Sequence, residues 1–142
     1  MSDDETFQFV DTKVLIYAHD QSAGVKHVQA KQLLTALWQN RYGCVSIQVL
    51  QEFYVNVTQK VAKPLDSAVA AQIISDLSAW QVHQPGIEDI LTAIRLQHEN
   101  KISFWDAMII SSAISLGCGI VWSEDLNHNQ KIDTVTIKNP FA

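Results

Sequence analysis

Four carboxylates along this chain could together bind a metal ion. Two follow short apolar segments and two lie in segments with helical spacing; in chain order they are Asp11, Glu52, Asp106 and Asp125. Acids brought within a few ångströms of one another repel and raise each other's pKa, so a cluster of them has an energetic cost. A divalent cation removes that cost, and Mg²⁺ and Mn²⁺ prefer oxygen ligands. The chemistry that such a cluster would support is metal-assisted hydrolysis of a phosphodiester.

The first two acids also have ordinary structural explanations. Asp11 closes the segment Phe-Val-Asp-Thr, and an Asp after a strand is often the N-cap of a helix. Glu52 falls on the side of its expected helix that faces away from the apolar residues, as any solvated helix residue would. Taken one at a time, these two positions do not distinguish a functional role from a structural one.

The other two acids are ambiguous in a different way. Asp106 is the one acid in the apolar segment 104–110 and follows Ser103 by three residues, so the pair could form a capping box at a helix N-terminus. That explains the position of Asp106 but not its apolar neighbours on all sides. Asp125 follows an apolar segment, and the adjacent Glu124 competes with it as the fourth acid. A loop carboxylate there could also be simply solvated.

The apolar pattern alternates short strands with helices. Strands are expected at 7–10, 44–46, 118–122 and 135–137, and helices at 26–38, 49–57, 69–80, 87–100 and 103–116. Residues 14–17 could continue the first strand or begin a helix. This alternation predicts an α/β domain with a mainly parallel sheet. Ligands of such sheets bind beyond the carboxyl ends of the strands, which is where Asp11 and Asp125 are expected to lie.

Length and composition predict one domain, residues 1–142, with residues 1–6 as a flexible tail. Apolar residues make up 47% of the chain, enough for a sizeable core, and charged residues only 18%. No apolar run reaches the roughly 18 residues of a membrane span, and the acidic N-terminus is unlike the basic start of a secretory signal. We therefore expect a cytoplasmic protein without membrane contact. The net charge of −5 argues against a broad basic surface for nucleic acid, so a nuclease would need local positive charge, most simply from metal ions.

Other residue types that often form sites give weaker signals here. Cys44 and Cys118 lie in apolar settings, which favours buried free thiols over a disulfide. The five histidines share no metal-ligand spacing, and among them only His128 lies near a candidate acid in sequence. The four tryptophans lie in apolar patterns and are expected in the core, although Trp105 could instead border a substrate groove.

Four segments, in order, resemble the motifs of PIN-domain nucleases, and they look most like VapC-type toxins of bacterial toxin–antitoxin pairs. The segments are 10–18, 46–54, 104–113 and 122–128, and the resemblance spans about residues 7 to 138. It implies an α/β/α sandwich with a mainly parallel sheet of about five strands. It also implies a Mg²⁺- or Mn²⁺-dependent endoribonuclease that is silenced by a cognate antitoxin and often forms a homodimer.

The resemblance assigns a role to each acid. Asp11 and Asp106 would hold the principal metal ion, while Glu52 and Asp125 would complete its coordination or orient the attacking water. Water would displace a ribose 3′-oxygen of the RNA substrate and leave a 5′-phosphate. The residues that would support these acids are Thr12, Lys13, Ser123 and Asn127.

Lys13 departs from the family pattern, which usually has Asn after Asp-Thr. Its ammonium could pair with Asp11, contact a substrate phosphate, or compete with a metal ion. The alternative function is therefore a PIN-like module that binds RNA or protein without cutting. A phosphatase or phosphoacceptor domain with Asp11 as nucleophile fits poorly, because haloacid-dehalogenase enzymes need a second Asp where Lys13 stands.

Overall fold

The computed structural model describes residues 5–142, and a six-stranded sheet forms its centre. The strands are β1 (Gln8–Val10), β2 (Gly43–Ser46), β3 (Gln81–His83), β4 (Ile120–Trp122), β5 (Lys131–Ile132) and β6 (Val135–Lys138). They lie in the order β3-β2-β1-β4-β6-β5, and every pairing is parallel except that of β5 with β6. The predicted α/β fold with a mainly parallel sheet is confirmed.

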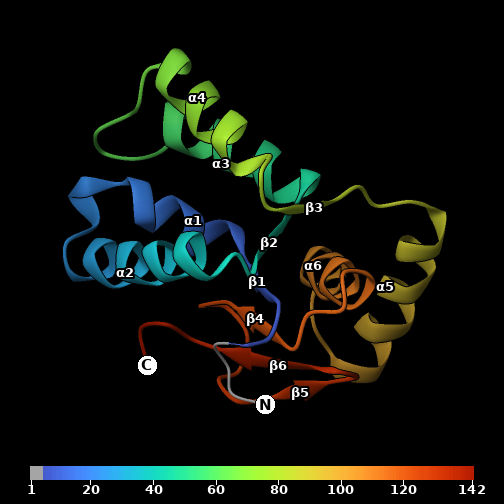
Figure 1. Cartoon of the computed structure of the whole chain (residues 1–142). Coiled ribbons are helices and arrows are strands. Elements are labelled where there is room, and N and C mark those ends of the chain that lie inside the picture. The colour runs from blue at the N-terminus through green and yellow to red at the C-terminus, as the bar shows by residue number, and fades with distance from the viewer. Residues whose placement is uncertain (1–4) are drawn as a thin grey trace.

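Helices cover both faces of this sheet. They are α1 (Thr12–His19), the 3₁₀ helix η2 (Gln21–Ala23), α2 (Val25–Asn40), α3 (Ile47–Gln59), α4 (Ser67–Leu77), α5 (Ile87–Asn100) and α6 (Phe104–Ser115). Figure 1 shows α1 and α2 on one side of the sheet and α5 and α6 on the other, with α3 and α4 beyond β2 and β3. The segment 14–17, which the sequence left open, is therefore helical.

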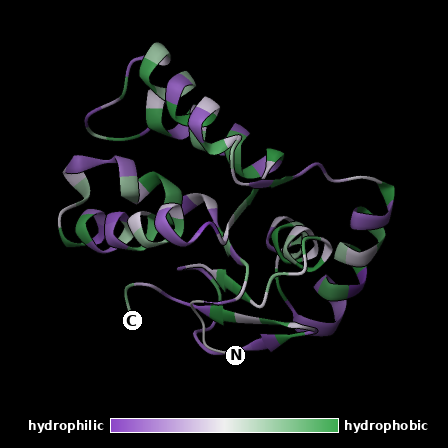
Figure 2. Cartoon of the chain, in the orientation of Figure 1, coloured by the Kyte–Doolittle hydropathy of each residue, from purple (hydrophilic) through white to green (hydrophobic). Residues whose placement is uncertain are grey.

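The core is built from the strands and from part of the apolar residues of the helices, whereas others that marked the helical pattern, Val28, Val69, Ile90, Leu91 and Ile94, are exposed. The strand residues Phe9, Val45, Val121 and Ile137 are fully buried. The flanking helices alternate apolar and polar residues along their length (Figure 2), as helices that cover a sheet with one face do. No helix in residues 5–142 is long and apolar enough to cross a membrane.

Two strands were not predicted, and both lie at an edge of the sheet. β3 is only partly buried, and β5 has two residues, of which Lys131 is exposed. An edge strand packs against one neighbour, so it needs no continuous apolar run and leaves little periodicity to detect. The sheet therefore has six strands rather than about five.

Side-chain caps begin the helices that carry the site. Asp11 caps α1 by accepting a hydrogen bond from the Thr12 backbone N–H, and Ser46 caps α3. Ser103 caps α6 by accepting from the backbone N–H of Asp106. Each cap satisfies a helix N–H that would otherwise have no partner. Asp11 is thus the helix N-cap that its position after a strand predicted, and any catalytic role would be additional to this structural one.

Cys44 and Cys118 are free and buried, as predicted, so the disulfide alternative was wrong. Of the expected flexible tail, residues 1–4 lie outside the described residues. Thr6 is half-buried beside Gly119, where an added Cβ would lie 2.7 Å from the Thr6 Oγ1.

Candidate metal site

The topology brings the four candidate acids to one pocket at the carboxyl edge of the sheet. β1 and β4 are adjacent and parallel, so Asp11 and Asp125 emerge side by side after them. Glu52 reaches the same place from α3, which follows β2, and Asp106 from the first turn of α6. All four line a cavity of about 240 Å³, together with Thr12, Lys13, Ile16, Gln48, Asn56, Trp105 and Ile109.

Asp11 is the most enclosed acid of the group, with 7% of its surface exposed. Its Oδ1 accepts from the Thr12 backbone N–H at 2.6 Å, and its Oδ2 accepts from the Ser123 hydroxyl at 2.9 Å. Its pKa is raised from 3.8 to about 6, mainly by burial and to a smaller extent by the nearby charges of Asp106 and Asp125, against the opposing effect of these hydrogen bonds. A carboxylate in this position is costly to ionise without a cation.

Ser123 links two of the acids. Its buried hydroxyl donates to Asp11 and accepts a hydrogen bond from the backbone N–H of Asp125 at 3.3 Å. Ser123, directly after β4, therefore orients the Asp11 carboxylate and holds the start of the loop that carries Asp125. The supporting role expected for Ser123 has this geometric basis.

Asp106 forms only half of the capping box that could have explained its position. Its backbone N–H donates to the Ser103 hydroxyl at 3.0 Å. No donor within residues 5–142 makes a hydrogen bond to its side-chain carboxylate in this structure. The carboxylate instead lines the pocket, where its charge acts on Asp11.

Glu52 is exposed, as its helical position predicted. Its Oε1 accepts a hydrogen bond from the Gln48 amide at 3.0 Å, one turn earlier in α3. The Gln48 side chain thus orients Glu52 at the edge of the pocket.

The structure distinguishes Asp125 from its neighbour Glu124. The Glu124 carboxylate accepts from the Tyr17 hydroxyl at 3.0 Å and pairs with the Lys26 ammonium, which also lies over the Tyr17 ring. Glu124 does not line the pocket of the other acids, whereas Asp125 does. Asp125 is therefore the better fourth member of the cluster.

Lys13 pairs with Asp125 rather than with Asp11. Its Nζ lies 2.8 Å from the Asp125 Oδ1, and this hydrogen bond is the main cause of the raised pKa of Lys13. The ammonium therefore occupies an oxygen that a metal ion would use. An exposed ion pair is worth at most about 1 kcal/mol, so a divalent cation can displace it.

Replacing Lys13 with the family's usual Asn is expected to tighten Mn²⁺ binding by about threefold to tenfold, because one competing charge is removed from the pocket. Titration calorimetry with Mn²⁺ would measure this. Lys31→Asn is the matched control: it makes the same change in net charge on α2, away from the acids. Equal affinities for the Lys13→Asn variant and the wild type would show that Lys13 does not compete with the metal.

The donor set fits a hard divalent cation. Four carboxylates supply the oxygen ligands that Mg²⁺ and Mn²⁺ prefer. Two buried oxygens that line the pocket, Thr12 Oγ1 and Gln48 Oε1, have no hydrogen-bond partner among the described residues. No three His, Cys, Asp or Glu side chains of the described chain are grouped closely enough to hold one ion as they stand. The acids therefore surround the pocket without forming a closed set of ligands.

Asn127 lies in an adjoining polar pocket rather than among the four acids. This second cavity, of about 280 Å³, shares Asp106 and Asp125 with the first, and its other lining residues are Asn100, Lys101, Ile102, Leu126, Asn127 and Gln130. His128 is exposed, accepts a hydrogen bond from the Asn139 backbone N–H, and lines neither of these two pockets.

Trp105 lies in the pocket, whereas the sequence favoured a place in the core and kept a groove position as the alternative. Of its surface 65% is exposed, and it lines the pocket of the acids. The available signal was its place beside Asp106, in the first turn of a helix that begins at the same pocket. Trp38 is partly exposed, whereas Trp80 is buried.

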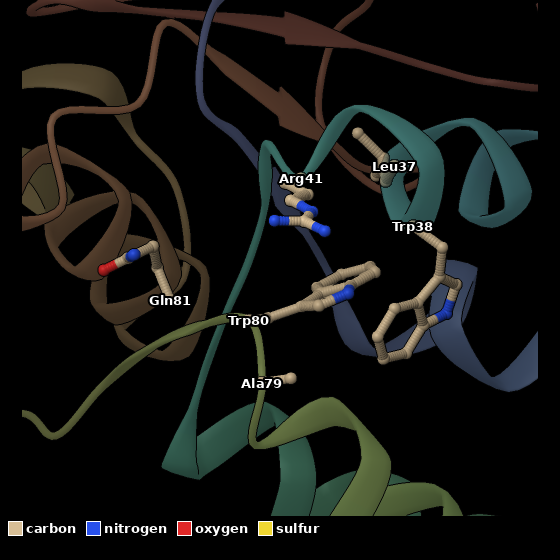
Figure 3. Close-up of a pocket in the computed structure, with 6 residues that line it drawn as sticks. All are labelled: Leu37, Trp38, Arg41, Ala79, Trp80 and Gln81. Carbon is tan, nitrogen blue, oxygen red and sulfur yellow. The ribbon is translucent and has the colours of Figure 1, made fainter.

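A cavity of about 420 Å³ lies away from the acids, where α2 ends and β3 begins (Figure 3). It is lined by Leu37, Trp38, Arg41, Ala79, Trp80 and Gln81. The Trp80 ring lies close against Gly43, where an added Cβ would be 2.7 Å from the indole. With one cation and no acid in its walls, this cavity is no candidate for a metal ion.

The fold resembles solved structures of toxins from toxin–antitoxin systems. VapC20 of Mycobacterium tuberculosis, described as a sarcin–ricin loop cleaving toxin, is 21% identical with a TM-score of 0.64, and the match covers 83% of this chain and 89% of that one. A chain of a toxin–antitoxin complex from Klebsiella pneumoniae is 18% identical with a TM-score of 0.68, covering 94% and 97%. A chain of the Rickettsia felis VapBC2 complex bound to a promoter DNA fragment is 18% identical with a TM-score of 0.66, covering 94% and 98%.

Family membership rests on the sequence itself. No curated protein sequence gives a significant match to the chain. The model of the PIN domain family matches residues 9–132, a span that includes all four acids of the pocket, Ser123 and Lys13. The chain therefore belongs to the PIN domain family.

Proposed function

We propose that this protein is a metal-dependent endoribonuclease and the toxin of a toxin–antitoxin pair. The observation that carries the proposal is the gathering of Asp11, Glu52, Asp106 and Asp125 around one pocket of a PIN domain. The structural neighbours support it, since one is described as a sarcin–ricin loop cleaving toxin and others as toxin–antitoxin complexes.

Each acid has a distinct task in this proposal. Asp11 and Asp106 hold the principal Mg²⁺ or Mn²⁺, and Glu52 and Asp125 complete its coordination or orient water. When bound, such an ion offsets the charge that develops on a phosphodiester and makes water a stronger nucleophile at neutral pH. Water adds to phosphorus as the bond to the ribose 3′-oxygen breaks, which leaves a 3′-hydroxyl and a 5′-phosphate.

The surrounding residues prepare the acids for this task. Ser123 and the Thr12 backbone N–H hold both oxygens of Asp11, so its orientation is fixed before substrate arrives. Gln48 holds Glu52 in the same way from one turn earlier. Such preorganisation lowers the reorganisation cost of the reaction.

The toxin–antitoxin neighbours support an antitoxin partner, and the family resemblance implies a homodimer. A cognate antitoxin would hold the enzyme silent, and two copies of the chain would form a homodimer. The whole of residues 1–142 would act as one nuclease domain in the cytoplasm, where its RNA substrate and antitoxin are made.

A binding module without nuclease activity is the second candidate function, and one observation favours it. The ion pair between Lys13 and Asp125 occupies an oxygen of the cluster. If this pair resisted displacement by a cation, the pocket would bind a partner without cutting it.

The test is cleavage of a total-RNA pool by protein freed from any antitoxin, in Mn²⁺, in Mg²⁺ and in EDTA. We expect discrete cuts with 5′-phosphate ends in either metal and none in EDTA. Folding is checked by circular dichroism in each buffer. Folded protein that leaves RNA intact in both metals would support the module that binds without cutting.

A further inference from the structure

Trp105 is a large, exposed aromatic side chain that lines the pocket of the four acids. It lies next to Asp106 in the first turn of α6, and 65% of its surface is exposed. The helix residues after it, from Ala107 to Ala113, are all buried. The Phe104 ring packs edge-on against the indole at 5.2 Å. The indole is therefore supported on one side and open to a ligand on another.

Two pockets share Asp106 and Asp125 and differ in their other lining residues. The first contains Trp105 with the apolar Ile16 and Ile109, and the second contains the polar side chains of Lys101, Asn127 and Gln130. A phosphodiester placed at the shared acids would thus have an aromatic surface within the first pocket. In the second pocket it would meet amides and an ammonium.

The charge of the protein limits how a nucleic acid can bind here. The net charge is −5, and the cations that line the two pockets are Lys13, already paired with Asp125, and Lys101. Few phosphate contacts are therefore available to provide affinity. Stacking of a base on an aromatic side chain contributes about 1–3 kcal/mol by alanine substitution and needs no positive charge.

We propose that Trp105 is a stacking platform for an unpaired base next to the cleaved phosphodiester. This inference rests on the proposed nuclease function and names a residue that would bind the substrate beside the acids. A base inside a duplex stacks on its neighbours and offers its face only when it is unpaired. Affinity comes mainly from this stacking, and its dependence on salt is shallow.

The experiment measures RNA binding and cleavage separately. Binding of a 12-nucleotide single-stranded RNA and of its duplex is measured by fluorescence anisotropy in EDTA, where no cleavage is expected. Trp105→Ala is expected to weaken binding of the single strand about tenfold, and Trp105→Phe by less than about threefold because a smaller ring remains. Trp38→Ala removes a partly exposed indole far from the acids and is the matched control, with no change expected.

Two further readouts separate stacking from a merely structural effect. An abasic site at the nucleotide bound by Trp105 should weaken wild-type binding about as much as Trp105→Ala does, with little added loss when the two are combined. In cleavage assays with Mn²⁺, Trp105→Ala should raise KM and leave kcat nearly unchanged. The slope of log affinity against log salt should correspond to about one or two phosphate contacts.

The outcomes distinguish this inference from the proposed function. Equal binding by the wild type and Trp105→Ala, or duplex RNA bound as tightly as the single strand, would overturn the stacking platform even if RNA is cut. Binding that depends on Trp105 without cleavage in either metal would support the platform and overturn the nuclease instead. A melting temperature for Trp105→Ala near that of the wild type excludes a folding defect.

Discussion

Asp106→Asn is expected to lower the rate of RNA cleavage in Mn²⁺ by about 1000-fold. Asn keeps the size of the side chain but removes the negative charge, so the affinity for a divalent cation falls. The fold should tolerate the change, since the helix cap at this position uses the Asp106 backbone N–H and the Ser103 hydroxyl. Initial rates over a range of Mn²⁺ concentrations measure the loss, and thermal unfolding verifies the fold.

Asp76→Asn is the matched control for this variant. Asp76 lies in α4 and accepts a hydrogen bond from Gln72 on an exposed helix face, so the same loss of one charge should leave activity unchanged. Cleavage by Asp106→Asn within tenfold of the wild-type rate would mean that Asp106 does not hold the metal that carries the reaction.

Asp11→Asn is expected to stabilise the metal-free protein at pH 7.5 by about 2–3 kcal/mol, although it abolishes cleavage. Burial raises the pKa of Asp11 to about 6 in the folded protein, above its ordinary value of 3.8. Between these values the folded state holds a proton that the unfolded state releases. The free energy of unfolding therefore falls as pH rises from about 4 through 6. Asn has no charge to bury, and its amide oxygen and NH₂ can still pair with the Thr12 N–H and the Ser123 hydroxyl.

Urea unfolding in EDTA at pH 3.5 and pH 7.5 tests this stability prediction. The two proteins should be nearly equal at the lower pH, where Asp11 is protonated in both states, and should diverge at the higher pH. Added Mn²⁺ should stabilise the wild type more than the variant, because only the wild type gains a favourable partner for the buried charge. A variant less stable than the wild type at both pH values would contradict the idea that Asp11 is costly to ionise.

The sequence predicted the parts of the fold that have a strong local signal. The apolar runs of β1 and β4 and the caps of α1 and α6 are properties of a few adjacent residues, and the bounds predicted for α5 agree with the structure. β3 and β5 have no such pattern, because hydrogen bonds to one distant neighbour make them strands. Sequence reasoning could not find them for this reason.

The candidate site likewise has a part that the sequence predicts and a part that depends on tertiary structure. Residue types, order and the family motifs identified Asp11, Glu52, Asp106 and Asp125 from the sequence alone. Their convergence depends on the adjacency of β1 and β4 and on the approach of α3 and α6, which are tertiary facts. Each acid also had a local explanation, so no single position could have shown the cluster.

Three details were decided only by contacts between residues distant in the chain. Glu124 points away from the pocket because its carboxylate binds Tyr17 of α1 and Lys26 of α2. Lys13 meets Asp125 rather than the nearby Asp11 because the loop after β4 brings that acid within reach. Trp105 stays exposed because its helix begins at the pocket, and burial depends on what packs against a side chain rather than on its hydrophobicity alone. The sequence thus determined which groups are available for chemistry, and the tertiary structure decided which of them face one another.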